Sequence, residues 1–382
     1  MGKPARWVGN RETLTSWRRA IGVGAHAAEV RFDRFSFGLK RRFGLLEPFE
    51  ILPYRGYGTP RELFLKGRVL EETGITRSGQ VGTPWENVRE MARRFASDEV
   101  AGARVQCSFR GMRVEAVADE EGFFEVRFQL PEPLAGSTQW HPVDLELLHP
   151  GSPDGRTVRS AGRVLVVNGA RFGIISDIDD TVVRSSATNV LKMAWIVLLN
   201  SARTRLPFEG VAAFYGALQR GGDGRECNPV FYVSSSPWNI YDLLEDFLDV
   251  HGLPAGPLFL KDWSPTVLGK HRSHKLGIIR TLLRTYPQLP FVLIGDSGEK
   301  DPEIYHQAAR EHPGRIRAIY IRDVTTHRRD AEVRTIAREV GSLGVEMILA
   351  PDTAFAAEHA AAEGLIAPDA VYSIRARSRG KP

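Results

Sequence analysis

Three carboxylates and a threonine directly follow an apolar run in the segment 173–181, GIISDIDDT. The apolar run is typical of a buried parallel strand, and open α/β sheets bind ligands at the carboxyl ends of such strands. Asp177 and Asp179 are two positions apart, so in an extended strand their carboxylates project to the same side. Such a pair can bind a hard divalent cation, or one member can attack phosphorus while the other transfers a proton. Taken alone, the motif also fits an acidic surface turn.

A second predicted strand, 229–233, runs directly into Ser234, Ser235, Ser236 and Pro237. Hydroxyl and backbone N–H groups at a strand-to-helix junction can bind phosphate oxygens. Serines before a proline are equally common as helix caps, so this segment indicates a phosphate site only in combination with the others.

A third predicted strand, 291–294, ends in the glycine-bearing turn GDSGEKDP at 295–302. Pro302 is placed to begin a helix. An aspartate at the end of a second parallel strand is what a metal shared with Asp177 requires, and this turn supplies Asp296 and Asp301.

Two lysines could neutralise a phosphoryl oxygen beside these carboxylates. Lys275 opens a predicted amphipathic helix, whereas Lys261 ends another apolar strand. Motif order and placement at a helix start favour Lys275. A solvated surface lysine is the alternative for either one.

These four pieces, taken in order, resemble the haloacid dehalogenase superfamily of phosphohydrolases. Three longer stretches look like the phosphatidate phosphatase catalytic-domain family within that superfamily: SDIDDT at 176–181, YVSSSPWN at 232–239 and LIGDSGEKDPEIY at 293–305. The resemblance covers about residues 165–330. Many superfamily members carry glycine where this chain has Asp180, but in the narrower family the acid is usual.

The resemblance implies a role for each matching residue. Asp177 is expected to be the nucleophile that forms an aspartyl-phosphate, and Asp179 the acid and base that serves the leaving oxygen and then water. An acid at this second position implies a phosphatase rather than a dehalogenase. Mg²⁺ is the implied cofactor. The predicted site comprises Asp177, Asp179, Lys275 and Thr181 for catalysis, Ser234, Ser235 and Lys275 for phosphate binding, and Asp177, Asp179, Asp296 and Asp301 for the metal.

Composition is that of an ordinary soluble globular protein long enough for about two domains: 382 residues, 42% hydrophobic and 25% charged. Cys107 and Cys227 are far apart in the sequence, which implies neither a disulfide framework nor a zinc site and fits a reducing compartment. No secretory signal is recognisable, and the longest apolar stretch, 193–199, is far shorter than a membrane span. We therefore expect a cytoplasmic protein.

Positive charge is concentrated at the two ends of the chain. Residues 1–45 hold ten Lys/Arg, three Asp/Glu and six Trp/Phe, a net charge of +7, and residues 375–382 have a net charge of +4. Since the total is +5, the remaining residues carry −6. Arginine interleaved with aromatics suits a membrane surface or a nucleic acid. The alternative is a segment that packs its aromatics on the body and leaves its arginines in water.

Periodicity divides the chain into four parts. A basic, aromatic arm (1–45, with a helix around 15–27) precedes an all-β sandwich (46–168) of immunoglobulin-like or transthyretin-like type, since short alternating strands occur at 64–70, 104–117, 123–130, 143–148 and 163–167. A hairpin-like turn at 119–122 joins two of them. Strands near 172–178, 229–234, 257–261, 290–295, 318–322 and 346–350 then alternate with helices such as 240–250 and 275–284, which predicts a haloacid dehalogenase-like, doubly wound parallel sheet (169–370). A basic tail (371–382) follows.

The long connection after the first of these strands, roughly 182–208, contains an apolar helix at 190–200. The superfamily carries its cap insertions at this position. An all-round apolar helix is most often buried in a core, although it could cover the site or contact lipid.

The sequence as a whole predicts a phosphomonoester phosphatase. The resemblance implies that it depends on Mg²⁺ and acts on phosphatidate, and the basic arm is compatible with peripheral attachment to the inner face of a membrane. One alternative is the same chemistry on a soluble phosphoester. A second is a non-catalytic phosphate-binding adaptor, against which the complete set of Asp177, Asp179, Lys275 and Asp296 argues. A nucleic-acid partner for the arm is the least favoured, and would show a salt-dependent affinity for DNA.

Overall fold

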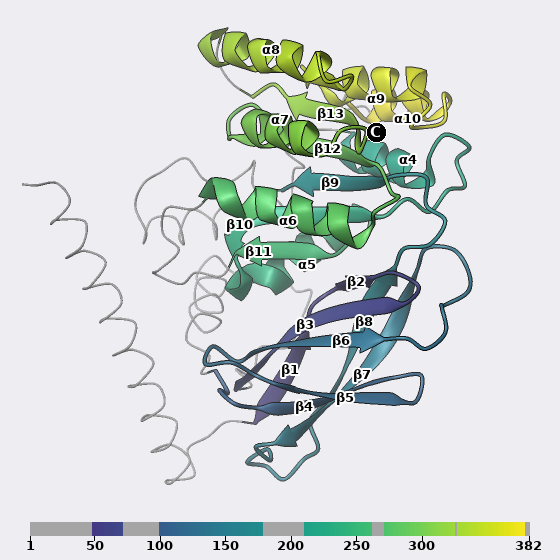
Figure 1. Ribbon diagram of the computed structural model, residues 1–382. Coiled ribbons are helices and arrows are strands. Elements are labelled where there is room, and N and C mark those ends of the chain that lie inside the picture. Colours follow the sequence, from purple (N-terminus) through teal and green to yellow (C-terminus); the bar gives the residue numbers. More distant parts are fainter. Residues whose placement is uncertain (1–47, 72–98, 179–209, 262–270, 325–326, 379–382) are drawn as a thin grey trace, which may run out of the picture.

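The computed structural model describes residues 48–71, 99–178, 210–261, 271–324 and 327–378 (Figure 1). Two sheets follow one another along the chain, and helices occur with the second sheet. The protein is therefore a mixed α/β chain whose N-terminal half is rich in sheet.

Eight strands build the first sheet, in the order β1-β3-β2-β8-β7-β4-β5, with β6 pairing with β3. All of these pairings are antiparallel except that between β2 and β8. The strands are β1 (Phe49–Pro53), β2 (Gly56–Gly58), β3 (Glu62–Glu71), β4 (Arg104–Phe109), β5 (Met112–Val117), β6 (Phe123–Gln129), β7 (Gln139–His149) and β8 (Arg159–Val166).

Alternation of side chains gives this sheet a buried face. In β4, for example, Val105, Cys107 and Phe109 are buried, while the positions between them are exposed or half-buried. Inward residues of β1, β3, β4, β6, β7 and β8 share one core. The sheet must fold over on itself to enclose that core.

The prediction of a single strand over 104–117 is wrong. β4 and β5 are separate antiparallel strands joined at Arg110 and Gly111, whose φ angles are 47° and 83°. Positive φ at both central residues is the geometry of a tight two-residue hairpin turn. The turn at 119–122 does not join paired strands either, because β5 pairs with β4 and β6 pairs with β3.

Six parallel strands build the second sheet, in the order β11-β10-β9-β12-β13-β14. The strand order reverses between β9 and β12, and in open α/β sheets ligands bind outside the carboxyl ends at such a reversal. The strands are β9 (Gly173–Asp177), β10 (Val230–Pro237), β11 (Leu258–Lys261), β12 (Phe291–Asp296), β13 (Ile316–Arg322) and β14 (Glu346–Ala350).

Helices pack on both faces of this sheet, over two separate cores. Figure 1 shows α6 (His271–Thr285), α7 (Asp301–Glu311) and α8 (His327–Gly341) along one side of the strands. The core of the other face includes residues of α4 (Val211–Arg220), α5 (Tyr241–Val250), α9 (Thr353–Ala362) and α10 (Ala370–Ser378). A short 3₁₀ helix, η1 (Trp238–Ile240), links β10 to α5.

Aromatic side chains join the first sheet to the second. The ring of Tyr54, in the turn after β1, stacks on Trp238 of η1 with a centroid distance of 4.6 Å. The Tyr54 ring is also 4.3 Å from that of Tyr241, at the start of α5. All three rings are buried, so the turn between β1 and β2 packs directly behind the end of β10.

Arg55 adds a buried electrostatic contact at the same junction. Its Nε lies 2.7 Å from Glu245 Oε1, and its Nη2 donates to Asp249 Oδ1 at 2.8 Å. The backbone N–H of Arg55 donates to the hydroxyl oxygen of Tyr241 at 2.6 Å. Burial of a guanidinium without such partners would be costly. Because the partners of Arg55 belong to α5, this network holds the first sheet and the second sheet with its helices in one orientation.

The mixed α/β prediction is thus confirmed, with β1 and β2 as strands that the sequence did not predict. The sandwich type, the haloacid dehalogenase-like assignment and the four domain limits stay predictions. The predicted helices at 15–27 and 190–200 lie outside the described residues. No described helix is long and apolar enough to cross a membrane.

Candidate functional site

The ends of three neighbouring strands bring the predicted site residues together. Asp177 ends β9 and is paired in register with Val233 of β10, so Ser234 follows immediately beside it. On the other side of β9, Ile294 of β12 pairs with Ser176, and Asp296 ends that strand two residues later. All three side chains are buried at the carboxyl edge of the sheet.

Lys275, in the first turns of α6, reaches this edge from one face of the sheet. Its Nζ lies 2.8 Å from Asp177 Oδ1, 2.6 Å from Glu299 Oε2 and 3.0 Å from Asp301 Oδ1. The Lys275 side chain is only 4% exposed, so its charge is balanced by these carboxylates rather than by water.

Asp301 is fully buried, and both of its oxygens are engaged. Oδ1 accepts from Lys275, and Oδ2 accepts from the backbone N–H of Asp296 at 3.2 Å. A side chain at Gly295 would collide with this carboxylate, so the tight approach requires glycine there. Burial raises the pKa of Asp301 to about 7, against the opposing charge of Lys275.

Asp296 uses one carboxylate oxygen to order the turn that follows it. Oδ1 accepts from the backbone N–H groups of Gly298 and Glu299, the second at 2.9 Å. Oδ2 is buried and has no hydrogen-bond partner among the described residues. Burial is also the main reason that the pKa of Asp296 is raised.

The buried carboxylates fit a hard divalent cation. Asp177, Asp296 and Asp301 each offer an oxygen, and these atoms lie within 4.8 Å of one another. The buried Oδ2 of Asp296 gives this set an oxygen that no described donor uses. Oxygen donors of this kind suit Mg²⁺, which takes few protein ligands and keeps waters.

The serines of β10 do not cap the next helix. β10 continues to Pro237, and neither η1 nor α5 receives a side-chain cap hydrogen bond. Ser234 is buried, and its Oγ accepts the backbone N–H of Ser236 at 3.0 Å. Ser235 is half-buried at the same strand end. The capping interpretation is therefore wrong, and a phosphate-binding role for Ser234 and Ser235 stays a prediction.

Of the two candidate lysines, Lys275 is the one in contact with Asp177. Lys261 ends β11, two strands away from β9, where burial lowers its pKa. Three further predicted residues, Asp179, Asp180 and Thr181, lie outside the described residues.

Sequence reasoning missed two arginines near this centre. Arg329 of α8 donates to the carbonyl oxygens of Ser297 and Glu299 at 3.0 and 2.8 Å, and thereby supports the turn after Asp296. Arg322 ends β13 and is paired in register with Asp296. A lone arginine has no spacing signature, but the position of Arg322 at the end of an apolar strand could have drawn attention to it.

A small pocket of about 90 Å³ opens at this edge, on the face of the sheet that α4 and α9 cover. Its lining combines the charged residues Asp177, Asp296, Arg322 and Asp352 with apolar ones such as Phe214 and Ala356. A ligand in this pocket therefore contacts charged groups and apolar carbon together.

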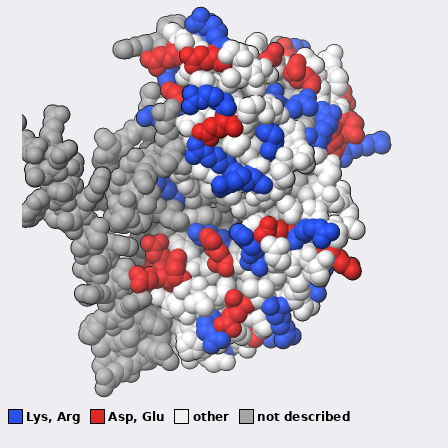
Figure 2. Space-filling view, in the orientation of Figure 1, with Lys and Arg blue, Asp and Glu red and all other residues white. Residues whose placement is uncertain are grey.

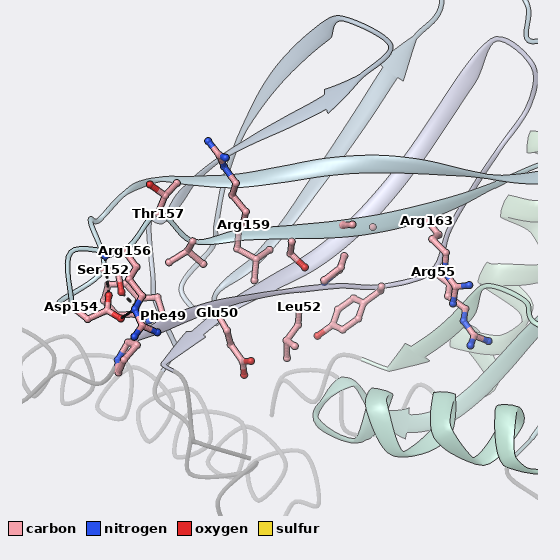
Figure 3. Close-up of a pocket in the computed structure, with 18 of the residues that line it drawn as sticks. Phe49, Glu50, Leu52, Arg55, Ser152, Asp154, Arg156, Thr157, Arg159 and Arg163 are labelled. Atoms are coloured by element: carbon pink, nitrogen blue, oxygen red, sulfur yellow. Dashed lines mark hydrogen bonds and ion pairs between the residues drawn. The ribbon is translucent and has the colours of Figure 1, made fainter. Parts of the chain in front are cut away.

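A larger cavity, of about 590 Å³, lies between β1 and β8 and contains none of the predicted site residues. Figure 3 shows Arg55 and Arg163 at one end of it and Asp154 and Arg156 at the other. Most of its arginines are matched with carboxylates, such as Arg156 with Asp154 at 3.3 Å. Of these two cavities, the smaller one is the one lined by predicted site residues, Asp177 and Asp296.

Comparisons with known proteins agree with this location. Residues 172–323 match the family model described as phosphatidate phosphatase APP1, catalytic domain. The chain is 35% identical over 174 residues to the phosphatidate phosphatase APP1 of Saccharomyces cerevisiae, a match that covers 42% of this chain and 28% of that protein.

An uncharacterised protein of Schizosaccharomyces pombe is 25% identical over 241 residues, which cover 60% of this chain and 39% of that protein. The chain thus spans well under half the length of both relatives. A solved structure of a carbohydrate acetylesterase from Xanthomonas citri is 12% identical, covers 75% of this chain and 73% of its own, and has a TM-score of 0.24, too low to support a conclusion about fold.

Proposed function

We propose that this chain, whose residues 172–323 belong to the phosphatidate phosphatase catalytic-domain family, is a Mg²⁺-dependent phosphatase that hydrolyses phosphatidate to diacylglycerol and inorganic phosphate. The haloacid dehalogenase-like mechanism through an aspartyl-phosphate is part of this proposal. The observation that carries it is the contact of Lys275 with Asp177, at the edge where Asp296 and Asp301 also gather.

In the first step, a carboxylate oxygen of Asp177 attacks phosphorus, and the bond from phosphorus to the ester oxygen breaks. Asp179 gives its proton to that leaving oxygen, which departs as an alcohol. Lys275 lies beside the attacking carboxylate, where its charge favours the ionised nucleophile and stabilises the negative charge on the phosphoryl oxygens.

In the second step, water attacks the phosphorus of the aspartyl-phosphate. Asp179 accepts a proton from this water, the bond from phosphorus to Asp177 breaks, and inorganic phosphate leaves. Ser234 and Ser235, at the end of the adjacent strand, are proposed to bind the phosphoryl oxygens in both steps.

The charges of the centre support a requirement for a cation. Among the described residues, Asp177, Asp296, Asp301 and Glu299 surround Lys275, so an anionic phosphate would meet mostly negative charge. Asp177 and Asp296, with Asp301 beside them, are the described residues that would bind Mg²⁺. When bound, it would neutralise this charge and polarise the phosphoryl group.

A lipid substrate would require the enzyme to work at a membrane surface. Each methylene taken out of the bilayer would cost about 0.8 kcal/mol, so the enzyme must reach the lipid in place. On the face shown in Figure 2, acidic and basic side chains are interspersed. The segment that we propose to attract the enzyme to an anionic membrane is 1–45, because its net charge is +7.

A phosphate-release screen tests the proposed function. The full chain is assayed with Mg²⁺ on phosphatidate in mixed micelles, on lysophosphatidate, and on soluble sugar phosphates, nucleotides and phosphopeptides. We expect kcat/KM to be highest for phosphatidate. A higher kcat/KM for a soluble ester would assign the same chemistry to another substrate, and absence of phosphate release from every substrate would reject the phosphatase itself.

A further inference from the structure

We propose that Arg322 is a substrate-binding residue that contacts the phosphoryl group from the opposite face of the sheet to Lys275. This inference rests on the proposed function for the identity of the ligand. It concerns a residue that no motif of the sequence indicates.

The position of Arg322 is fixed by the sheet. Arg322 is the last residue of β13, and its Cα is paired in register with that of Asp296. The backbone at this point is held on both sides, because the N–H of Ser297 donates to the carbonyl oxygen of Arg322 at 2.9 Å and Arg322 pairs with Ala350 of β14. Its side chain therefore starts from a rigid strand end beside a predicted metal ligand.

The side chain lines the small pocket together with both reacting-centre carboxylates, Asp177 and Asp296. Lys275 is not among the residues that line this pocket, because α6 packs on the other face of the sheet. The two cations thus approach Asp177 from different faces.

Charge balance explains why a second cation is useful there. Asp177, Glu299 and Asp301 already contact Lys275, so its charge is neutralised before substrate arrives. Of the described residues that line the pocket, Arg322 is the one with a positive charge. A guanidinium can also donate two parallel hydrogen bonds to phosphate oxygens, which an ammonium cannot.

The surroundings of Arg322 are those of a group that gains from binding an anion. Burial lowers its pKa to about 10, and the charge of Asp177 opposes that effect, so the guanidinium is still charged at neutral pH. A phosphate dianion in the pocket would add a charge-assisted partner to this buried guanidinium.

The apolar residues of the lining indicate what is attached to the phosphate. Val211 and Phe214 of α4 and Ala356 of α9 line the pocket, beside the polar Thr353 and Asp352, so carbon atoms next to the phosphoryl group can contact apolar side chains. At about 90 Å³ the pocket accommodates a phosphoryl group and a few carbons.

The test compares Arg322→Gln and Arg322→Lys with Arg317→Gln, which removes an exposed arginine of the same strand. Binding of inorganic phosphate is measured by calorimetry in Mg²⁺ buffer, KM and kcat are measured on the best substrate, and thermal unfolding reports on the fold. We expect Arg322→Gln to raise both the phosphate Kd and KM about tenfold or more, because one charge-assisted interaction is lost. The change in kcat should be smaller.

Arg322→Lys should bind phosphate with intermediate affinity, and Arg317→Gln should behave as the unmodified chain. A folded Arg322→Gln variant with unchanged phosphate Kd and unchanged KM would overturn the inference. If Arg322→Gln does not fold, the lysine variant decides, since phosphate affinity equal to that of the unmodified chain would also overturn it. The phosphate-binding measurement is informative even if no phosphoester is hydrolysed, so failure of the proposed function and failure of this inference are distinguishable.

Discussion

Lys275 Nζ lies 2.8 Å from Oδ1 of Asp177, although the two residues come from a helix start and a strand end far apart in the sequence. The contact is buried, and Glu299 and Asp301 complete the surroundings of the same ammonium. A lysine held against a carboxylate in this way favours the ionised form and orients it, which is what an attacking nucleophile needs.

Asp177→Asn should reduce phosphate release by roughly 10⁴-fold or more, in the range of losses seen when a catalytic side chain is removed. The amide keeps the shape of the side chain but is a poor nucleophile. Initial rates on the best substrate measure the effect, and Asp246→Asn, which changes an exposed aspartate of α5, is the matched control. Near-normal turnover by a folded Asp177→Asn variant would exclude Asp177 as the nucleophile.

Removal of divalent cations should abolish phosphate release, and Mg²⁺ should restore it. Asp296→Asn should raise the Mg²⁺ concentration required for half-maximal activity, because it replaces a buried anionic ligand by a neutral one. Glu346→Gln is the control, since Glu346 belongs to a second, more exposed acidic group with His359 and Glu363. Unchanged activity in excess chelator would contradict the metal requirement.

The pH dependence of the free energy of unfolding should reveal the titration of Asp301. Its pKa is about 7 in the folded protein, against an ordinary value of 3.8, so between these values the folded state binds a proton that the unfolded state has released. The free energy of unfolding therefore falls as pH rises through this window.

The measurement is the Tm of chelator-treated protein from pH 4.5 to 7.5. Asp301→Asn, which carries no ionisable group at this position, should show a flatter profile than the unmodified chain. Parallel profiles for the two proteins would show that Asp301 does not titrate in this range.

Arg55→Ala should destabilise the protein by about 3–5 kcal/mol, the usual effect of removing one partner of a buried ion pair. Glu245 would lose the guanidinium 2.7 Å away, and its side chain is only 13% exposed. Arg163→Ala is the control, since that arginine is 53% exposed and 4.0 Å from Glu245, and should cost less than about 1 kcal/mol. Urea unfolding monitored by tryptophan fluorescence measures both, and equal effects would refute a special role for Arg55.

Deletion of residues 1–45 should weaken binding to vesicles that contain phosphatidate, because this segment carries a net charge of +7. Co-sedimentation at low and high salt measures the effect. The full chain should bind reversibly and release as salt rises, since screening weakens attraction between exposed charges. Equal binding with and without residues 1–45 would exclude a membrane role for this segment.

The sequence was most informative where buried strands end in polar residues. The strand ends at Asp177, Ser234 and Asp296 could be predicted because apolar runs and turn residues mark them, and parallel strands bring such ends to one edge. Lys275 could be preferred to Lys261 because a helix start after the second motif is a more specific signal than a lone strand end.

Other features depend on contacts that no local pattern encodes. β1 and β2 are five and three residues long, too short for alternation to be distinctive. The turn at Arg110 and Gly111 could not be predicted because arginine rarely adopts positive φ. The alternation of apolar and polar residues also continues across these two positions, so it predicts one strand. Arg322 gains its significance only from the neighbour strand that places Asp296 beside it.

The stacking of Tyr54 on Trp238 has a consequence for how this protein can be divided. Trp238 directly follows β10, the strand that carries Ser234 and Ser235, and a fragment limited to residues 172–323 would expose that ring and Tyr241 to water. The same cut would remove α9, whose Thr353 and Ala356 line the small pocket. A transplant of the catalytic residues into another protein would therefore have to include the turn at 54–55 and the C-terminal helices.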